Sequence, residues 1–238
     1  MPTRPTPLRP PPAKASAPTR RSQEERSSAT QQRLCQAAVD LLSEVGYERL
    51  TTAQIAQRAG VSKGAQAHHY PSKDDMLVAA FQYLLLQWEE RRAAYARTHG
   101  AGGDMDDLLQ SMWRQVFGRP DYLASLEVML AARHNAALRD RLREVLRGWI
   151  VVRDETFRDL LPLDDPDELA TFLQINFCVL RGLAVYEGLA EDKGLPQRVL
   201  RLWSDIASTF VAQRRRPAGK PAVKPAAKPP LLGRLPVG

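Results

Sequence analysis

Residues 59–70 read AGVSKGAQAHHY, a small-residue turn followed by a short polar segment that ends in two adjacent histidines. Gly60 can adopt the positive φ angle that a tight turn requires. Ser62 can cap a short helix over 63–69, and Pro71 disfavours any continuation of that helix. The stretch therefore predicts a turn and a short helix that carries almost no large apolar side chain.

The segments before this turn complete a helix-turn-helix pattern. The apolar positions of 31–47 follow the 3,4 spacing of one helix face, and Gly46 supplies a C-terminal cap. Thr51 and Gln54 form a capping-box pattern at the start of a second short helix. Two short helices joined by an Ala-Gly-Val turn and braced by a preceding helix make a helix-turn-helix unit. A helix as short and polar as 63–69 suits the major groove of DNA, which is about 12 Å wide.

The motif T-T-A-Q-I-A-x-x-A-G-V-S-K-G-A-x-x-x-H-Y-P-S-K-D-x-M-L, which starts at Thr51, resembles the DNA-binding segment of the TetR family of bacterial transcriptional repressors. The resemblance covers roughly residues 31–88. In that family a recognition helix enters the major groove and flanking residues hold phosphates. The resemblance implies DNA contacts by Thr51, Thr52, Ser62, Lys63, Gly64, Ala65, Gln66, His68, His69, Tyr70 and Lys73.

Within this set we expect base reading by Lys63, toward guanine, and by Gln66, toward adenine. The alternative for Lys63 is a contact to phosphate alone. The family usually has an aromatic residue where this chain has Ala67. We expect His69 to combine a phosphate contact with packing at the helix end, and His68 to face the groove or the solvent.

The paired histidines do not predict a metal or catalytic site. Neighbouring residues on a helix point about 100° apart, so His68 and His69 do not converge on one ion. His99 and His134 lie in other segments, away from any carboxylate-rich motif. The sequence has no nucleophile–base pair, phosphate-binding Gly-rich loop or HExxH pattern. We therefore expect no catalytic residue, no metal and no cofactor.

The rest of the chain predicts an all-α protein. Ser72 with Asp75 starts a long helix, and further segments keep the helical period of apolar residues. Residues 165–168, Asp-Pro-Asp-Glu, start a helix that is apolar on nearly all sides and must be covered all round. The expected fold is an N-terminal three-helix helix-turn-helix DNA-binding module followed by a larger helical ligand-binding and dimerisation domain.

The two ends of the chain differ in composition from the rest. Residues 1–29 and 214–238 are rich in proline and basic residues, with formal charges of +4 and +7, which leaves the body at −4. We expect both tails to be disordered, either as solubilising ends or as non-specific contacts to polyanions. Between them we expect the DNA-binding domain over 30–88, with its motif at 51–70, and the second domain over 89–213.

Two features point to a cytoplasmic protein, and the resemblance implies a bacterial one. Cys35 and Cys178 lie far apart within apolar helical patterns, which predicts buried free thiols in a reducing compartment. The chain has no secretory signal and no uninterrupted apolar run of about 18 residues, so we expect no membrane partner.

In the resembled family, the last two long helices of each subunit form a four-helix dimer interface, and a ligand among the middle helices spreads the two recognition helices. The resemblance thus implies a homodimer on a palindromic operator in double-stranded DNA, and a small-molecule effector. A narrow apolar stripe in the last helix supplies the candidate interface, with internal core packing as the alternative: Val199, Trp203, Ile206 and Phe210. Candidate ligand contacts, each alternatively plain core, are Trp113, Phe117, Met129, Arg133, Trp149, Phe172, Asn176 and Phe177.

Three functional classes compete at this point. The leading prediction is a ligand-responsive DNA-binding regulator, most simply a repressor, that associates with the nucleoid when bound to DNA. Following the resemblance, we expect a small, largely apolar molecule to release it from DNA, and the lack of an evident basic cluster in the ligand region mildly disfavours a highly anionic one. A sequence-tolerant nucleoid protein is the second class, motivated by the Lys-Pro-Ala tail. An all-α enzyme is the third, and the absence of catalytic motifs argues against it.

Overall fold

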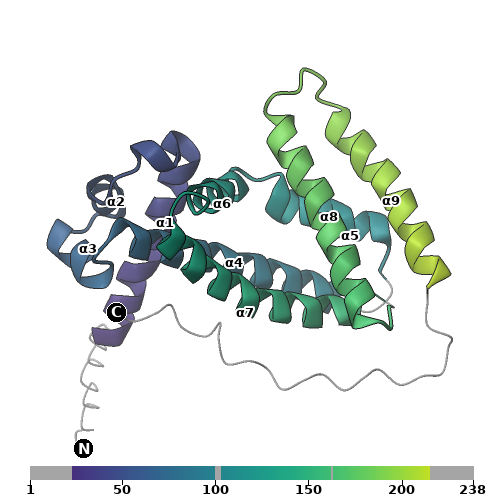
Figure 1. The fold of residues 1–238 in the computed structure, drawn as a ribbon, viewed down its shortest axis with the longest axis horizontal. Coiled ribbons are helices and arrows are strands. Elements are labelled where there is room, and N and C mark those ends of the chain that lie inside the picture. The colour runs from purple at the N-terminus through teal and green to yellow at the C-terminus, as the bar shows by residue number, and fades with distance from the viewer. Residues whose placement is uncertain (1–22, 100–102, 162, 215–238) are drawn as a thin grey trace, which may run out of the picture.

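The computed structural model describes residues 23–99, 103–161 and 163–214, and all regular structure in these ranges is helical (Figure 1). The elements are α1 (Gln23–Arg49), α2 (Thr52–Ala59), α3 (Lys63–His69), α4 (Lys73–His99), α5 (Met105–Met112), the π-helical turn η1 (Trp113–Phe117), α6 (Pro120–Ala131), α7 (Ala136–Leu160), α8 (Pro166–Glu187) and α9 (Leu195–Gln213). The all-α prediction is confirmed.

The first helix begins earlier than the composition predicted. Residues 23–29, which we assigned to a disordered tail, form the first turns of α1, where Glu24 and Glu25 favour the positive end of the helix dipole. The predictions for 1–22 and 215–238 lie outside the described residues. Near its other end α1 is interrupted at Gly46, whose φ of 74° and ψ of 171° lie in a region that only glycine adopts readily.

The helix-turn-helix unit has the predicted caps. The Thr51 hydroxyl accepts a hydrogen bond from the Gln54 N–H at 3.3 Å, while the Gln54 side chain accepts one from the Thr51 N–H at 2.8 Å. Gly60 ends α2 with a left-handed φ of 65°. Ser72 and Asp75 form the same reciprocal pair at the start of α4. Ile55 of α2 is fully buried, so the turn holds α3 firmly against the module core.

α4 joins the two parts of the molecule. Its first half supplies Met76, Leu77 and Phe81 to the core around α1, and its second half runs alongside α7 (Figure 1). The predicted boundary at residue 88 therefore falls inside a helix. α1 also packs on α6, so the helix-turn-helix module touches the larger domain through two elements.

α8 and α9 form an antiparallel pair at the end of the molecule away from α2 and α3 (Figure 1). α8 is not covered all round within one chain, contrary to the prediction, because Ile175, Val185 and Tyr186 are exposed. By length and composition alone α8 is also apolar enough to cross a membrane. Its other face is buried against α7, α9 and η1, as expected for a core helix.

The two cysteines differ in exposure, which corrects one expectation. Cys35 is buried with its Sγ 3.6 Å from the Tyr70 hydroxyl, and burial raises the pKa of its thiol to about 12. Cys178, which we expected to be buried, is exposed. Because α8 is open on one side, its outward positions reach solvent.

Alkylation tests this difference in exposure. At a protein concentration low enough to populate the free subunit, iodoacetamide at pH 8 should modify Cys178 of the folded protein and leave Cys35 intact, because only a thiolate that is accessible reacts. In 6–8 M urea (roughly the range that unfolds most domains) both should react. Peptide mass spectrometry measures each site, and equal labelling of Cys35 and Cys178 in the folded protein would contradict the packing of α1.

Candidate DNA-binding surface and ligand cavity

One face of α3 is open to solvent. Lys63, Gly64, Ala67 and His68 are exposed and lie on the same side of the helix, and we call these four residues the reading face. The Ser62 hydroxyl caps the helix by accepting from the Ala65 N–H at 3.1 Å. The face carries one long cation, one imidazole and two small residues that leave room for a close approach.

Gln66 is not on this face, which corrects the expected base reader. Its side chain is 4% exposed, and its Nε2 donates to the Tyr70 carbonyl at 2.6 Å. The side-chain amide of Gln66 thus stabilises the C-terminal end of α3 by a hydrogen bond on the buried side of the helix. Gln66 sits on the inward side of the helix with Tyr70, and a polar residue type alone did not reveal that direction.

Two further expected DNA contacts are used inside the protein. The Tyr70 side chain is buried with its hydroxyl beside Cys35, so it does not reach a phosphate. Lys73 is half-buried, and its Nζ donates to the Tyr47 carbonyl at 2.7 Å and lies 4.0 Å from the centroid of the Tyr47 ring. Burial lowers the pKa of Lys73, opposed by Glu48 and Asp74. Its ammonium closes the end of α1.

The other expected DNA contacts lie at the start of α2 and along α3 and its cap. Thr51 and Ser62 are exposed, whereas Thr52, Ala65 and His69 are half-buried. Burial, with a smaller contribution from the like charge of His68, lowers the pKa of His69 and so disfavours its charged form. Among the described residues no group of three or more His, Cys, Asp or Glu side chains could hold a metal ion.

A cavity of about 240 Å³ lies in the larger domain, bounded by α4, α5, η1, α6, α7 and α8. Four of the expected ligand contacts line it: Phe117, Met129, Trp149 and Phe177. Its wall also includes aromatic residues that sequence reasoning missed: Phe81, Trp88, Tyr95, Tyr122 and Phe157. These come from helices whose apolar stripes gave no sign of which side chains meet.

The remaining four expected ligand contacts lie elsewhere. Arg133 is exposed, and Trp113 is buried against Gly118. The other two hold α8 to α9. Phe172 stacks on Phe210 with ring centroids 5.1 Å apart, and Asn176 accepts from Trp203 Nε1 at 2.8 Å.

Four arginines line the cavity, and no acidic residue does: Arg91, Arg92, Arg153 and Arg181. This corrects the expectation that the region lacks a basic cluster. The arginines come from α4, α7 and α8 and are far apart in the sequence, so only the fold brings them together. Three of the four arginines form ion pairs with acidic residues outside the lining. Arg91 lies 3.6 Å from Asp121, Arg153 donates to Asp154 at 2.6 Å, and Arg92 pairs with Glu89.

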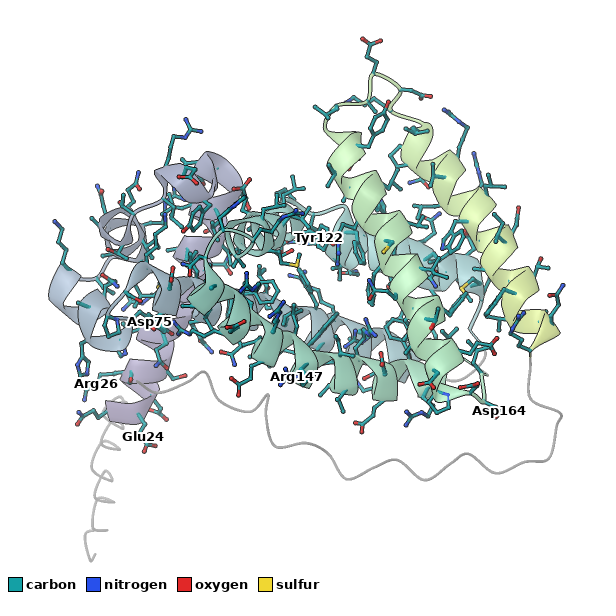
Figure 2. The ribbon with its side chains drawn as sticks, viewed as in Figure 1. Glu24, Arg26, Asp75, Tyr122, Arg147 and Asp164 are labelled. Atoms are coloured by element: carbon teal, nitrogen blue, oxygen red, sulfur yellow. The ribbon has the colours of Figure 1, made fainter. Side chains whose placement is uncertain are left out.

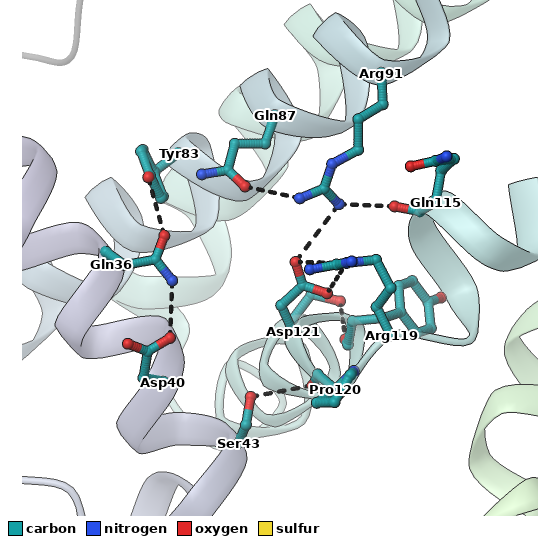
Figure 3. Close-up of polar contacts among 12 residues, drawn as sticks. Gln36, Asp40, Ser43, Tyr83, Gln87, Arg91, Gln115, Arg119, Pro120 and Asp121 are labelled. Carbon is teal, nitrogen blue, oxygen red and sulfur yellow. Dashed lines mark hydrogen bonds and ion pairs between the residues drawn. The ribbon is translucent and has the colours of Figure 1, made fainter. Parts of the chain in front are cut away.

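α6 lies between the cavity and α1. Tyr122, Ser125 and Met129 of α6 line the cavity. On its α1 side the Pro120 carbonyl accepts from the Ser43 hydroxyl at 3.0 Å, and Glu127 accepts from the Tyr47 N–H at 2.9 Å. Figure 3 shows the same α6 terminus held by Arg91 through Asp121. A displacement of α6 would therefore reach the DNA-binding module.

A second link joins α1 to α4 directly. The Tyr83 hydroxyl donates to Gln36 at 3.0 Å, and Gln36 in turn donates to Asp40 at 2.8 Å (Figure 3). These neutral and charged side chains fix the crossing of the two helices on their solvent side. The module thus keeps its shape where it meets α4.

The candidate interface stripe of α9 is only partly free. Val199, Trp203 and Phe210 are half-buried against their own chain, whereas Ile206 is 50% exposed. The exposed large apolar side chains of α8 and α9 form what we call the α8–α9 apolar face: Ile175, Val185, Tyr186, Leu202 and Ile206.

Comparison with known proteins agrees with this geometry. The family described as "Bacterial regulatory proteins, tetR family" matches residues 34–80. The HTH-type transcriptional regulator CymR of Pseudomonas putida is 36% identical over 209 residues, which cover 84% of this chain and 100% of that protein. The chain belongs to the TetR family. As a TetR-type protein it is a DNA-binding transcriptional regulator, which confirms the resemblance found in the sequence.

Solved structures support the same fold for this TetR-type regulator. A transcriptional regulator from Rhodococcus has 25% identity and a TM-score of 0.60, covering 79% of this chain and 99% of that one. The regulator FadR from Bacillus subtilis, solved in complex with stearoyl-CoA, has 18% identity and a TM-score of 0.54 over 76% of this chain and 97% of that one. At that identity the second comparison concerns the fold alone.

The inward position of Gln66 makes a prediction about stability. Gln66→Ala should lower the free energy of unfolding by about 1–3 kcal/mol, because it removes a buried hydrogen bond and leaves the Tyr70 carbonyl without its partner. Gln57→Ala, at an exposed position of α2, is the matched control and should change stability by about 0.5 kcal/mol or less. Urea unfolding measures both, and equal effects would place Gln66 on the surface.

Proposed function

We propose that this regulator is a repressor that binds a palindromic operator as a homodimer and releases it when a small, largely apolar molecule occupies the cavity. One observation carries the proposal. The exposed reading face and the cavity lie in different parts of the chain, and α4 and α6 both line the cavity and pack on α1, which in turn packs on α2. A regulator that responds to a ligand needs such a connection between its two sites.

Base recognition is assigned to the reading face. Lys63 can donate to guanine O6 and N7, and His68 can donate or accept at a base edge. Gly64 and Ala67 let the backbone of α3 approach the groove floor, and the Ala67 methyl can contact a thymine methyl. Phosphate contacts are assigned to the surrounding polar groups: Thr51, Thr52, Ser62, Ala65 through its backbone, and His69.

Dimerisation is assigned to the α8–α9 apolar face. Large apolar side chains that cluster on the surface of one subunit are typical of an interface. Two-fold pairing of this face would place the same residues opposite one another in both subunits. Each recognition helix would then read one half-site, with half-site centres about 34–36 Å or a multiple of it apart.

Release by an effector is assigned to α6. A molecule in the cavity would press on Tyr122 and Met129, and α6 would pass the displacement to α1 through Ser43 and Tyr47. Because α1 braces α2 and α3, the recognition helix would turn relative to its partner. We assign this action to the bacterial cytoplasm, where the operator lies in the nucleoid.

Base discrimination tests the reading face. Lys63→Ala and His68→Ala should each lose about 1–3 kcal/mol of preference for the operator over duplexes with single base changes. Lys193→Ala is the control, because it removes the same charge from an exposed loop between α8 and α9. Competition binding to duplexes from a random-sequence selection measures the preference. If all three variants discriminate like the unchanged protein, α3 does not read bases.

Sedimentation tests the dimer. Ile206→Glu should convert it to a monomer, since a charge buried in the interface without a partner costs several kcal/mol. The position is already half-exposed in one subunit, so the fold should survive. Ser208→Glu, exposed on another side of α9, should remain dimeric. A folded Ile206→Glu variant that still sediments as a dimer would move the interface elsewhere.

A further inference from the structure

We propose that the cavity is built for a monoanion, the carboxylate of a small and otherwise apolar molecule, held among Arg92, Arg153 and Arg181. The identity of this ligand as the effector rests on the proposed function. The chemistry of the cavity rests on the side chains that form its wall, and it can be tested without DNA.

The first observation is an imbalance of charge. Four arginines line the cavity, and three carboxylates outside the lining pair with them. Arg181 is the fourth, and its only recorded polar contact among the described residues is from Nε to the Tyr122 hydroxyl at 3.0 Å. One positive charge therefore stands at an apolar wall without a counter-ion. A half-buried guanidinium gains most from a ligand that carries one negative charge.

The second observation is a set of hydrogen-bond donors with nothing to donate to. In the part of the chain that the structure describes, the indole Nε1 atoms of Trp88 and Trp149 are buried without an acceptor. Arg92 Nε and the Tyr95 hydroxyl are buried in the same way. All four residues line the cavity. Buried donors in native proteins nearly always find a partner, so donors of this kind along one wall point to a ligand rich in acceptors.

The guanidinium groups of Arg92 and Arg153 both lie near the Trp149 ring. The Cζ atoms of Arg92 and Arg153 each lie 5.6 Å from the centroid of the Trp149 ring. Arg153 also lies 5.0 Å from the centroid of Phe177. Burial, and then the like charge of Arg153, lowers the pKa of Arg92. An anion beside the two would relieve both effects, whereas a cationic ligand would add to the repulsion.

The rest of the wall sets the body of the ligand. It is aromatic and aliphatic, with Phe81, Leu85, Phe117, Tyr122 and Phe157 among the lining residues. The volume of about 240 Å³ lies just below the usual range of ligand pockets, roughly 300–1,000 Å³. The cavity therefore suits a molecule of one or two rings, or a short alkyl chain, with its carboxylate toward the arginines.

Three probes of one shape separate charge from shape: 2-naphthoate, 2-naphthalenemethanol and 2-naphthylmethylammonium. Thermal unfolding of the full chain measures their binding, because a ligand that binds the folded state raises Tm. We expect 2-naphthoate to bind about tenfold or more tightly than the alcohol, and the cation to bind least. Decanoate against decanol repeats the comparison with an alkyl body.

Variants then locate the charge. Arg181→Gln keeps a donor for Tyr122 but should reduce the preference for carboxylate over alcohol by about tenfold. Arg181→Lys should retain most of the preference. Arg147→Gln is the matched control, since it removes a charge from the outer side of α7, away from the Tyr122 side of the cavity (Figure 2), and should leave the preference unchanged.

The inference is overturned if the alcohols bind as tightly as the carboxylates. It is also overturned if neither carboxylate raises Tm at a few millimolar (a concentration at which even weak ligands with Kd of about 1 mM bind), or if Arg181→Gln keeps the full preference. Failure of the proposed function has a different signature. A carboxylate that binds with the expected preference but does not release operator DNA would leave the cavity assignment intact and remove its effector role.

Discussion

The architecture depends on α4 being one uninterrupted helix. Its first turns are fixed by the Ser72–Asp75 cap and by Lys73, which closes the end of α1. Phe81 in its middle is buried in the core that supports α2 and α3, and Arg92 further along stands in the cavity wall. α4 therefore belongs both to the core under α2 and α3 and to one wall of the cavity, which is the connection that the proposed response to a ligand needs.

α6 supplies the second connection. One of its faces lines the cavity and the other holds α1 through Ser43 and Tyr47. α4 and α6 thus give the proposed response two routes between the cavity and the DNA-binding module. The arginines of the cavity fit this arrangement. Arg91 forms an ion pair with Asp121 at the start of α6 and donates to the Gln115 carbonyl of η1. A charged ligand in the cavity would therefore lie close to the residue that holds the start of α6.

The sequence predicted the parts that local chemistry determines. The Thr51 and Ser62 caps, the left-handed Gly60 and the Ser72–Asp75 start of α4 each depend on residues close together in the chain, and each was found. The direction of a polar side chain was not predictable in this way. Gln66 and Lys73 were assigned to DNA, but both are hydrogen-bonded inside the module, because α1 and the end of α3 offer buried carbonyls. The cluster of cavity arginines was missed for the same reason, since it exists only after α4, α7 and α8 pack. Three residues of the reading face, Lys63, Gly64 and His68, were predicted DNA contacts. Ala67, noted in the sequence only because the family usually has an aromatic residue there, is an exposed small residue of the same face.

The central claim is that two copies of α3, held by one symmetric dimer, read a discrete operator. Hydroxyl-radical footprinting on the strongest site from genome-wide binding-site mapping tests it most directly. The account predicts two protected half-sites related by two-fold symmetry, with centres about 10–10.5 base pairs or a multiple of that apart. Protection that spreads along any duplex without a symmetric boundary would contradict it, and would indicate a sequence-tolerant DNA protein.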